Sequence, residues 1–412
     1  MDIHSHIDNP KQLEKMYRDN KSEFKAALKL LNPQQMDQKL IAYWNERINY
    51  DRPDISWGNR NELLFLLIAS LVAGALAKIP SLFDLNPELF YQRNIGFIVF
   101  PILTCYFAWS RGLSIKRTIF AGFIFLFGVV YINLLPSTEK SDTLILACIH
   151  LPLLLWAVVG FSYANGEFKN TSKILEFLRY NGDLIIITGL ILISGGMLTG
   201  ITIGLFSVIG IQIEDFYFNY FGIFGIAAAP IVGTYLTQTN PQLVNKISPV
   251  IAGIFSPLVF IMLLIYLVAI FYSGKDPYND REFLLIFNAL LIGVMAIILF
   301  SISETGKQRT GKLGSYILLG LSLVTIIVNG IALSAILYRI SEWGITPNRM
   351  AVLGANTLML IHLVFITIQL MRHVFKKAEI QRVEYSIVLF IPVYILWICL
   401  VTFIFPFIFQ FN

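Results

Sequence analysis

Residues 316–371 read YILLGLSLVTIIVNGIALSAILYRISEWGITPNRMAVLGANTLMLIHLVFITIQLM, and this stretch decides the fold class. Its two apolar runs, 316–338 and 349–371, each reach the roughly 20 residues that a helix needs to cross a bilayer. Between them, residues 338–349 concentrate two arginines, a glutamate, a tryptophan and a Gly/Pro pair. The stretch therefore predicts two membrane-spanning helices joined by a loop rich in charged and aromatic side chains.

The composition of the whole chain is that of a protein embedded in a bilayer. Its 412 residues are 56% hydrophobic and only 14% charged, and the mean hydropathy is +0.68. A chain this apolar is not a soluble enzyme. The net charge of +5 is modest, so we expect no nucleic-acid partner. The three cysteines lie inside apolar runs without CxxC spacing, which favours packing over a disulfide.

Apolar runs of spanning length repeat from residue 62 to the end, and we count eleven. The sequence thus predicts an all-α polytopic bundle, in three parts. A polar segment, 1–61, precedes four spans in 62–180 and seven spans in 181–412. The first run is the shortest. The runs are approximately 63–79, 95–110, 118–135, 143–163, 184–211, 216–236, 247–272, 283–303, 316–338, 349–371 and 385–409.

The distribution of basic residues predicts the orientation of the bundle. If the N-terminus is cytoplasmic, the inner loops carry fourteen Lys and Arg, the N-terminal segment ten and the outer loops seven. This bias predicts an inner N-terminus and an outer C-terminus. The assignment keeps every Lys and Arg outside the spans or at their edges, as for Lys78 and Arg349. It also leaves no carboxylate or amine at the bilayer midplane, where ion-coupled transporters commonly keep one.

Residues 1–61 predict a small helical hairpin. Apolar residues recur at three- or four-residue intervals from Leu13 to Leu31, and a second amphipathic stretch runs from Met36 to Ile48. We interpret the hairpin as lying on the membrane or against the bundle. The alternative is that it recognises lipid, a cytoplasmic protein partner or a second copy of the chain.

The fifth span carries the clearest packing pattern. Gly196, Gly200 and Gly204 recur at four-residue spacing, which places them on one face and lets another backbone approach closely. We expect a tight helix crossing there, with the sixth span and its Pro230 as the partner. The alternative is a substrate path along the exposed carbonyls of a helix broken by glycine and proline.

The outward half of the predicted bundle has more side chains that could form a functional site than the inward half. Arg339 ends the ninth span and Arg349 begins the tenth, so both could face Glu214, Asp215 or Glu342 across a shallow vestibule. Guanidinium groups suit carboxylates and phosphates equally. The pattern favours an ion-pair cluster that holds the outer loops together, and the alternative is a site for an anion or a lipid headgroup.

Polar residues inside the ninth and tenth spans predict a hydrogen-bonded seam. Asn329 falls between the depths of Asn356 and His362, at 1.5 Å of rise per residue. Such seams usually hold helices together, and a solute-binding seam is the alternative. His362 and His150 are the intramembrane side chains that titrate near neutral pH, and packing roles are favoured for both.

Three short segments resemble a family of polytopic bacterial membrane proteins that is known only as a domain of unknown function. The resemblance spans roughly residues 178–409 and implies an all-helical fold in the bacterial cytoplasmic membrane. It implies no activity and no residue roles. The segments are Tyr338-Arg339 with Gly344-Ile345-Thr346 and Arg349, in the pattern Y-R-x(4)-G-[ILV]-T-x-x-R, then Arg179-Tyr180, and Asp280-Arg281-Glu282-Phe283.

Three functions stay open from the sequence. The first is a transporter or permease for a small anionic solute or lipid, with Arg339 and Arg349 attracting the anion. The second is a sensor or scaffold that relays an envelope signal through residues 1–61. The third is a membrane transferase without a recognisable motif, since no P-loop, HExxH, GxSxG or clustered metal spacing is found. We expect no cofactor and no metal site.

Overall fold

The computed structural model describes the chain in segments, and all of its described elements are helices and turns. The segments comprise residues 9–19, 24, 27–28, 43–44, 46–47, 60–136, 141–273, 278, 281–305, 312–376 and 378–411. No strand occurs in these ranges, which confirms the all-α prediction. The chain divides into two compact units, Met1–Gly58 and Asn59–Asn412. The sequence-based division at residue 180 therefore falls inside the second unit.

The N-terminal unit has a small core of its own. Helix α1 (Pro10–Asp19) contributes Leu13 and Tyr17, which pack with Phe24 and Leu28, and all four side chains are at most 7% exposed. These apolar side chains thus pack against one another within the unit. The segment from Met36 to Ile48 lies mostly outside the described residues.

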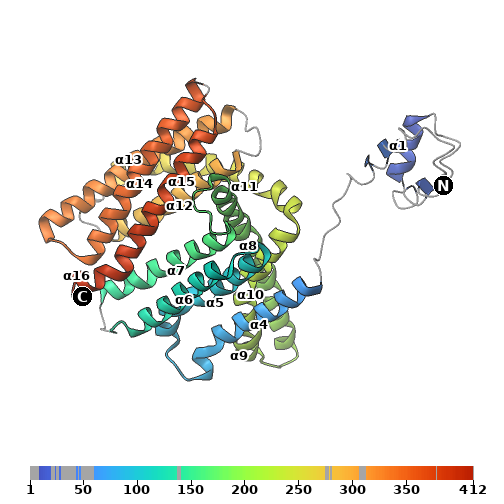
Figure 1. The fold of residues 1–412 in the computed structure, drawn as a ribbon, viewed down its shortest axis with the longest axis horizontal. Helices are drawn as coiled ribbons and strands as arrows, with labels where there is room; N and C mark the ends of the chain where they lie inside the picture. The colour runs from blue at the N-terminus through green and yellow to red at the C-terminus, as the bar shows by residue number, and fades with distance from the viewer. Residues whose placement is uncertain are drawn as a thin grey trace. The chain divides into compact units, whose positions relative to one another are not determined.

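The membrane unit is a succession of long helices joined by short turns (Figure 1). Two short π-helical segments, η3 and η4, continue directly into neighbouring helices. In chain order the elements are α4 (Arg60–Leu82), α5 (Pro87–Ser110), α6 (Ile115–Leu134), α7 (Asp142–Tyr163), α8 (Thr171–Val208), α9 (Glu214–Tyr217), η3 (Phe218–Gly222), α10 (Ile223–Thr239), α11 (Pro241–Ser273), α12 (Arg281–Thr305), α13 (Lys312–Trp343), α14 (Pro347–Lys376), α15 (Gln381–Cys399), η4 (Leu400–Ile404) and α16 (Phe405–Ile408).

Each of the eleven predicted runs coincides with helix, and nine helical segments of the described chain are long and apolar enough to cross a membrane. The nine include α4, which corresponds to the short first run. They do not include α5, where Arg93 and Asn94 lie within the helix, or α12, whose described apolar part is Phe287–Ser303. The count of eleven and the orientation stay predictions.

Local sequence explains where several helices begin and end. Asn86 accepts hydrogen bonds from the N–H groups of Glu88 and Leu89 at 3.0 and 3.2 Å, and so starts α5. Ser141 accepts from the N–H of Leu144 at 3.2 Å at the start of α7. Gly112 follows α5 with a φ of +65°, a conformation that glycine adopts without strain.

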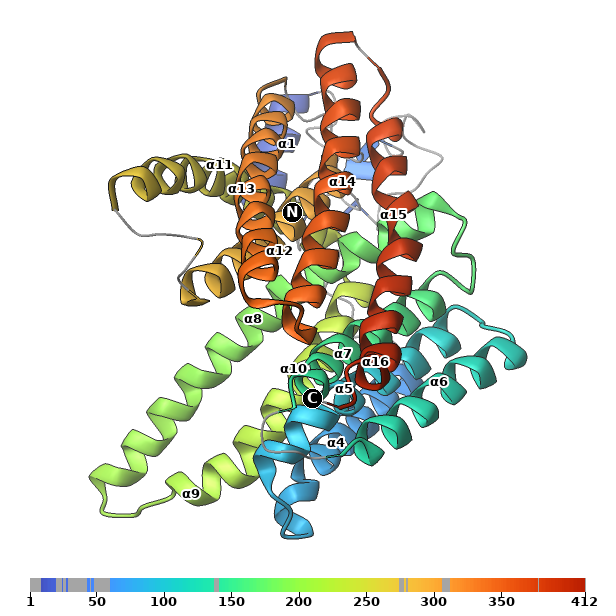
Figure 2. The ribbon, with the colours of Figure 1, turned by 90° about the vertical axis from the view of Figure 1, so that its left-hand side faces the viewer.

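The helices of this unit form two groups that α8 connects. The first group is α4, α5, α6 and α7 with α10, and the second is α11 to α15, the yellow, orange and red helices of Figures 1 and 2. Helix α8 contacts α7 and α10 of the first group and α12 and α15 of the second. Its N-terminal end is therefore one place where the two groups meet, and α7 also contacts α14, α15 and η4 directly.

The predicted packing role of the glycine stripe on α8 is wrong for the described chain. A Cβ added at Gly196, Gly200 or Gly204 would meet nothing within 4 Å. Instead Gly233 of α10 approaches Thr188 of α8, 2.7 Å from the added Cβ to Oγ1. At about 100° per residue, the stripe lies roughly 80–160° around the helix from Thr188, so α10 passes it by. The distal part of α8 extends with α9 away from α12–α15 (Figure 2).

Candidate functional site

The loop 338–349 is a compact connection between two helices. Gly344, at a φ of +76°, follows α13 and donates its N–H to the carbonyl of Ile340 at 2.9 Å. Thr346 then begins α14, because its Oγ1 accepts from the N–H of Arg349 at 3.3 Å and Pro347 takes the first helical position. The glycine and the threonine of the Y-R-x(4)-G-[ILV]-T-x-x-R pattern thus have local structural roles.

Arg349 closes the C-terminal end of α13. Its Nη1 donates to the carbonyl oxygens of Trp343 and Gly344, both at 2.7 Å. The last carbonyls of a helix have no partner within the helix and attract positive charge. The Arg349 guanidinium also lies 5.7 Å from the centre of the Trp343 ring.

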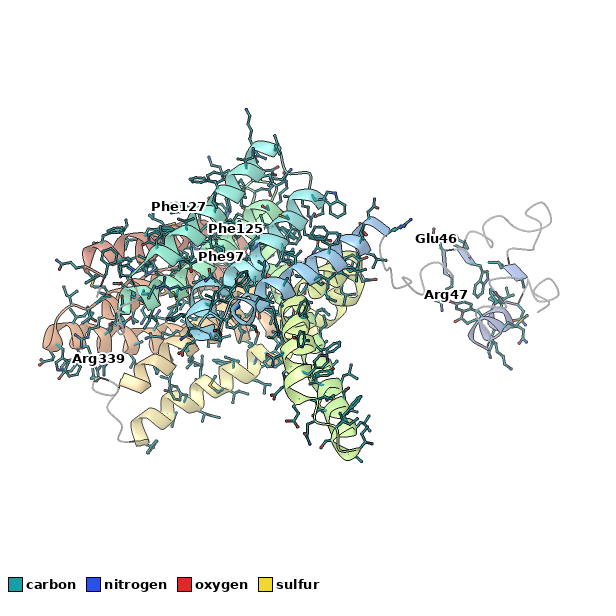
Figure 3. All side chains as sticks on the ribbon, turned by 90° about the horizontal axis from the view of Figure 1, so that it is seen from below. Glu46, Arg47, Phe97, Phe125, Phe127 and Arg339 are labelled. Atoms are coloured by element: carbon teal, nitrogen blue, oxygen red, sulfur yellow. The ribbon has the colours of Figure 1, made fainter. Side chains whose placement is uncertain are left out.

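Arg339, labelled at the end of α13 in Figure 3, binds a neighbouring loop. Its Nε donates to the carbonyl of Tyr278 at 2.9 Å, and its guanidinium lies 5.3 Å from the Trp343 ring centre. Tyr278 also packs edge-on against Tyr338, with ring centroids 5.6 Å apart. The Tyr-Arg pair therefore holds Tyr278, the one residue that the structure describes between α11 and α12.

The predicted pairing of these arginines with Glu214 and Asp215 is wrong. Both carboxylates lie on α9, which contacts α8 and η3 at the tip of the α8–α10 hairpin, far from the α13–α14 loop (Figure 2). The hairpin carries α9 away from the other helices, which the linear order of the loops does not reveal. Glu342 is exposed and forms no ion pair with a described residue.

The structure brings Asn329 and Asn356 together, as the polar seam requires. Asn329 Nδ2 donates to the carbonyl of Asn356 at 3.1 Å, and Asn356 Nδ2 donates to Asn288 Oδ1 at 2.9 Å. Asn329 and Asn356 are at most 1% exposed, and Asn329 Oδ1 has no partner in the described chain. The seam joins three helices, because Asn288 belongs to α12, a helix that the sequence did not connect to it.

His362 leaves the seam and faces α15. Its Nδ1 lies 3.1 Å from the hydroxyl of Tyr394, and its ring stacks on Phe390 with centroids 4.4 Å apart and planes 4° apart. His150 bonds the carbonyl of Leu146, four residues earlier on its own helix, at 2.9 Å. Both contacts fit packing roles.

A cavity that the sequence did not indicate lies where α8 and α15 begin and α14 ends. Its volume is about 790 Å³, within the range of small-molecule sites. Most of its lining residues are polar or charged. The lining residues are Thr171, Ser172, Leu175, Arg179, Gln369, Arg372, Gln381, Arg382, Glu384 and Tyr385.

A partly buried ion pair forms one wall of this cavity. Arg179 Nη2 lies 3.4 Å from Glu384 Oε1, and each side chain is 12% exposed. The Nε of Arg179 also donates to the carbonyl of Ser303 near the end of α12. One arginine of α8 therefore ties the ends of α12 and α15 together, which keeps the cavity between fixed walls.

The other two arginines of the cavity are available to a ligand. Arg372 and Arg382 are exposed, and neither side chain has a hydrogen-bond or ion-pair partner among the described residues. With Arg179 and Glu384 included, the lining carries a net formal charge of +2. Gln369 adds a carboxamide whose Oε1 has no partner in the described chain. This arrangement can bind an anion.

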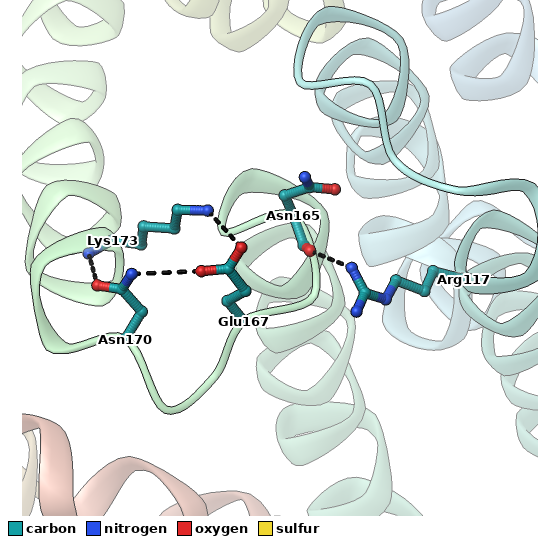
Figure 4. Close-up of polar contacts among 5 residues, drawn as sticks. All are labelled: Arg117, Asn165, Glu167, Asn170 and Lys173. Carbon is teal, nitrogen blue, oxygen red and sulfur yellow. Dashed lines mark hydrogen bonds and ion pairs between the residues drawn. The ribbon is translucent and has the colours of Figure 1, made fainter.

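The turn between α7 and α8 positions the N-terminal end of α8 at the cavity (Figure 4). Lys173 pairs with Glu167 at 2.8 Å, and Asn170 donates to the same carboxylate at 3.3 Å. Hydrogen bonds from Lys173 and Asn170 lower the pKa of Glu167. Arg117 of α6 donates to the carbonyl of Asn165 at 2.7 Å, which anchors the turn from the other side.

The sequence analysis did not predict this cavity. Arg179, Arg372 and Arg382 were among the fourteen basic residues of the inner loops, and Arg179 also belonged to the Arg179-Tyr180 segment, but Gln369 and Glu384 had no assigned role. Residues 179, 369 and 384 come from three helices, and no spacing in the chain links them. Within the described chain, no group of three His, Cys, Asp or Glu residues is placed to hold a metal ion.

Comparisons with known proteins assign nothing to this geometry. No protein-family model matches the chain, and no curated protein or solved structure matches it. The residues of the cavity and the seam are therefore the basis for a functional proposal.

Proposed function

We propose that this membrane protein is a transporter or permease for a small anionic solute or an anionic lipid. The observation that carries the proposal is the arginine-lined cavity between α8, α14 and α15. Its unpartnered Arg372 and Arg382 are better placed to receive an anion than Arg339 and Arg349, whose guanidinium groups already bind carbonyl oxygens.

The proposed orientation places the cavity at the cytoplasmic face. The loops that line it, after α7 and after α14, are inner loops when 24 of the 31 Lys and Arg are inside. The resemblance of residues 178–409 supports the bacterial cytoplasmic membrane as the location. An anion from the cytoplasm would then meet the cavity before it meets the bundle.

Polar groups continue from the cavity toward the middle of the bundle. Gln369 lines the cavity, His362 lies about 10 Å further along α14, and Asn356 about 20 Å further, at 1.5 Å per residue. Polar side chains within spans are expensive to bury and often mark a solute pathway. This line of groups supports transport over simple binding.

Reconstitution tests the proposal directly. The full chain in proteoliposomes should take up at least one member of a panel of radiolabelled organic phosphates and carboxylates. Arg372→Gln combined with Arg382→Gln should reduce this uptake at least tenfold, because charge-assisted hydrogen bonds to the anion are lost. Arg60→Gln serves as the matched control, since Arg60 is exposed and lies outside the cavity lining. Equal uptake by the double variant and the wild type would contradict the proposed site.

Thiol accessibility tests the route. In a variant without Cys105, Cys148 and Cys399, single cysteines replace Gln369, His362 and Asn356 in turn. Labelling by a small hydrophilic reagent that proceeds from 369 inward to 356 supports a water-filled path. Labelling confined to 369 would mean a closed bundle beyond the cavity and would count against transport.

A sensor or scaffold is the second candidate, and the N-terminal unit favours it. Residues Met1–Gly58 form a separate compact unit, with an ion pair between Arg47 and Glu14 at 3.0 Å beside its aromatic core. Such a unit suits recruitment of a partner. Removal of residues 1–58 should abolish signalling and leave the bundle and any solute uptake intact. Loss of uptake on this deletion would instead tie the unit to transport.

A further inference from the structure

The cavity contains hydrogen-bond acceptors as well as positive charge. Glu384 faces Arg179 through one contact of 3.4 Å, which is long for a charge-assisted hydrogen bond. A carboxylate has about four acceptor positions, so this one retains acceptor capacity. Gln369 beside it has an Oε1 without a donor in the described chain. Buried acceptors without donors are unfavourable, and a ligand that donates hydrogen bonds would satisfy them.

The donors and the acceptors differ in exposure. Arg372 and Arg382 are exposed, whereas Glu384 is 9% exposed. An anionic group can therefore bind the exposed Arg372 and Arg382 while another part of the same ligand reaches the less exposed acceptors. A purely anionic ligand would leave Gln369 Oε1 without a donor, and would also be repelled by the charge of Glu384.

The size of the cavity fits a ligand with two functional ends. A volume of about 790 Å³ far exceeds the space that one tetrahedral anion needs. Tyr385 and Leu175 add an aromatic and an aliphatic surface to the lining, which suits a short carbon chain.

We infer that the cavity binds a ligand with a phosphate at one end and a hydrogen-bond-donating ammonium at the other, an aminoalkyl phosphate. The phosphate binds Arg372 and Arg382, and the ammonium donates to Glu384 and Gln369. The same chemistry occurs in a free aminoalkyl phosphate and in a lipid headgroup. The inference rests on the proposed function, for which it names the substrate class.

Isothermal titration of the full chain in detergent with two matched probes tests the inference. Phosphoethanolamine carries both ends, and ethyl phosphate lacks the ammonium. We expect phosphoethanolamine to bind about tenfold more tightly, the effect of one hydrogen bond to a charged group. Gln369→Leu should reduce this ratio severalfold with little change for ethyl phosphate, and Gln369→Glu should increase it. A wild-type ratio near one, or a ratio that neither variant changes, would overturn the inference.

The phosphate end has its own test. Arg372→Gln with Arg382→Gln should weaken both probes at least tenfold, while Arg60→Gln, at an exposed arginine outside the lining, should leave both unchanged. These side chains have no partners in the described chain, so their replacement should not unfold the protein. Unchanged affinity in the double variant would mean that the phosphate binds elsewhere and would refute the assignment.

Lipid competition identifies the source of the ligand. The chain is placed in nanodiscs of phosphatidylcholine with or without phosphatidylethanolamine. The choline ammonium has no N–H to donate. If only phosphatidylethanolamine competes with phosphoethanolamine, the inference is supported and the natural ligand is a lipid headgroup. Unimpeded phosphoethanolamine binding supports it and indicates a free solute. Equal competition by phosphatidylcholine would overturn the role of the donor.

Binding and flux separate this inference from the proposed function. Selective binding without uptake into proteoliposomes would leave the ligand class intact and refute transport. Uptake of anions without preference for an ammonium would leave transport intact and refute the ligand class.

Discussion

At the scale of single residues, arginines close the C-terminal ends of helices. Arg93 donates three hydrogen bonds, each 3.0 Å long, to carbonyls at the end of α6. Arg179 does the same for α12 and Arg349 for α13. Free carbonyls at a helix end carry partial negative charge, and a guanidinium satisfies several of them at once. Basic residues near the spans thus stabilise helix ends, in addition to their effect on the orientation of the bundle in the membrane.

Arg349→Gln should destabilise the folded chain by about 1–2 kcal/mol, because the carbonyls of Trp343 and Gly344 lose charged donors. Equilibrium unfolding in mixed detergent measures the change. The matched control is Glu342→Gln, at an exposed neighbour without a described ion pair, which should change stability by less than about 0.5 kcal/mol. Equal effects of the two substitutions would disprove the capping role.

Glu167 gives a pH-dependent prediction. Hydrogen bonds from Lys173 and Asn170 lower its pKa in the folded chain. A lowered pKa stabilises the folded state above the unfolded value of about 4.3, and the contribution disappears as the pH falls through the folded value. Wild type should therefore unfold at a higher temperature than Glu167→Gln at pH 7, and the gap should close below about pH 4. A gap independent of pH would show that the carboxylate charge is not responsible.

At the scale of elements, α8 shows how one helix can serve two surroundings. Its first turns are packed, with Leu175 and Tyr180 at 3% exposure, and they carry Arg179 to the cavity. Its distal apolar stretch is largely uncovered within the described chain. Glycine spacing alone did not distinguish the packed end from the open one, because small residues permit a close approach without requiring it.

Matched glycine substitutions test this difference. A Cβ at Gly354 would lie 2.0 Å from the Trp397 ring, whereas one at Gly200 would meet nothing. We expect Gly354→Ala to destabilise the chain by about 1–3 kcal/mol through overpacking. Gly200→Ala should be neutral or stabilising by up to about 1 kcal/mol, because alanine favours helix. Destabilisation by Gly200→Ala would reveal a partner on the stripe.

At the scale of the whole molecule, the number of membrane crossings depends on whether α5 and α12 cross the bilayer. The other runs are represented among the nine helical segments of spanning length in the described chain. Both α5 and α12 pack within their helix groups, against α7 and α13 respectively. A helix that packs along a membrane-spanning neighbour is expected to cross the membrane beside it. The packing of α5 and α12 therefore supports eleven crossings.

Single cysteines at three exposed positions test the crossings, in a background without the three free cysteines. Eleven crossings place Asp84 and Ile345 outside and Lys169 inside. An impermeant maleimide should then label Asp84→Cys and Ile345→Cys in intact cells, and Lys169→Cys only after permeabilisation. Labelling of positions 84 and 169 from one side would mean that α5 does not cross. Labelling of positions 169 and 345 from one side would mean that α12 does not cross the membrane.

The sequence by itself determined the helical class and the approximate position of every long helix, because apolar length and helical spacing are local properties. It also predicted a polar seam through Asn329 and Asn356, on the condition that the polar faces of the two helices meet. Only the tertiary structure decided that Glu214 and Asp215 lie far from Arg339, that Gly233 makes the close approach to α8, and that Arg179, Gln369 and Glu384 share a cavity. These features depend on how distant helices pack. Pattern and spacing along a chain do not encode which helix ends meet, because many arrangements bury the same apolar faces equally well.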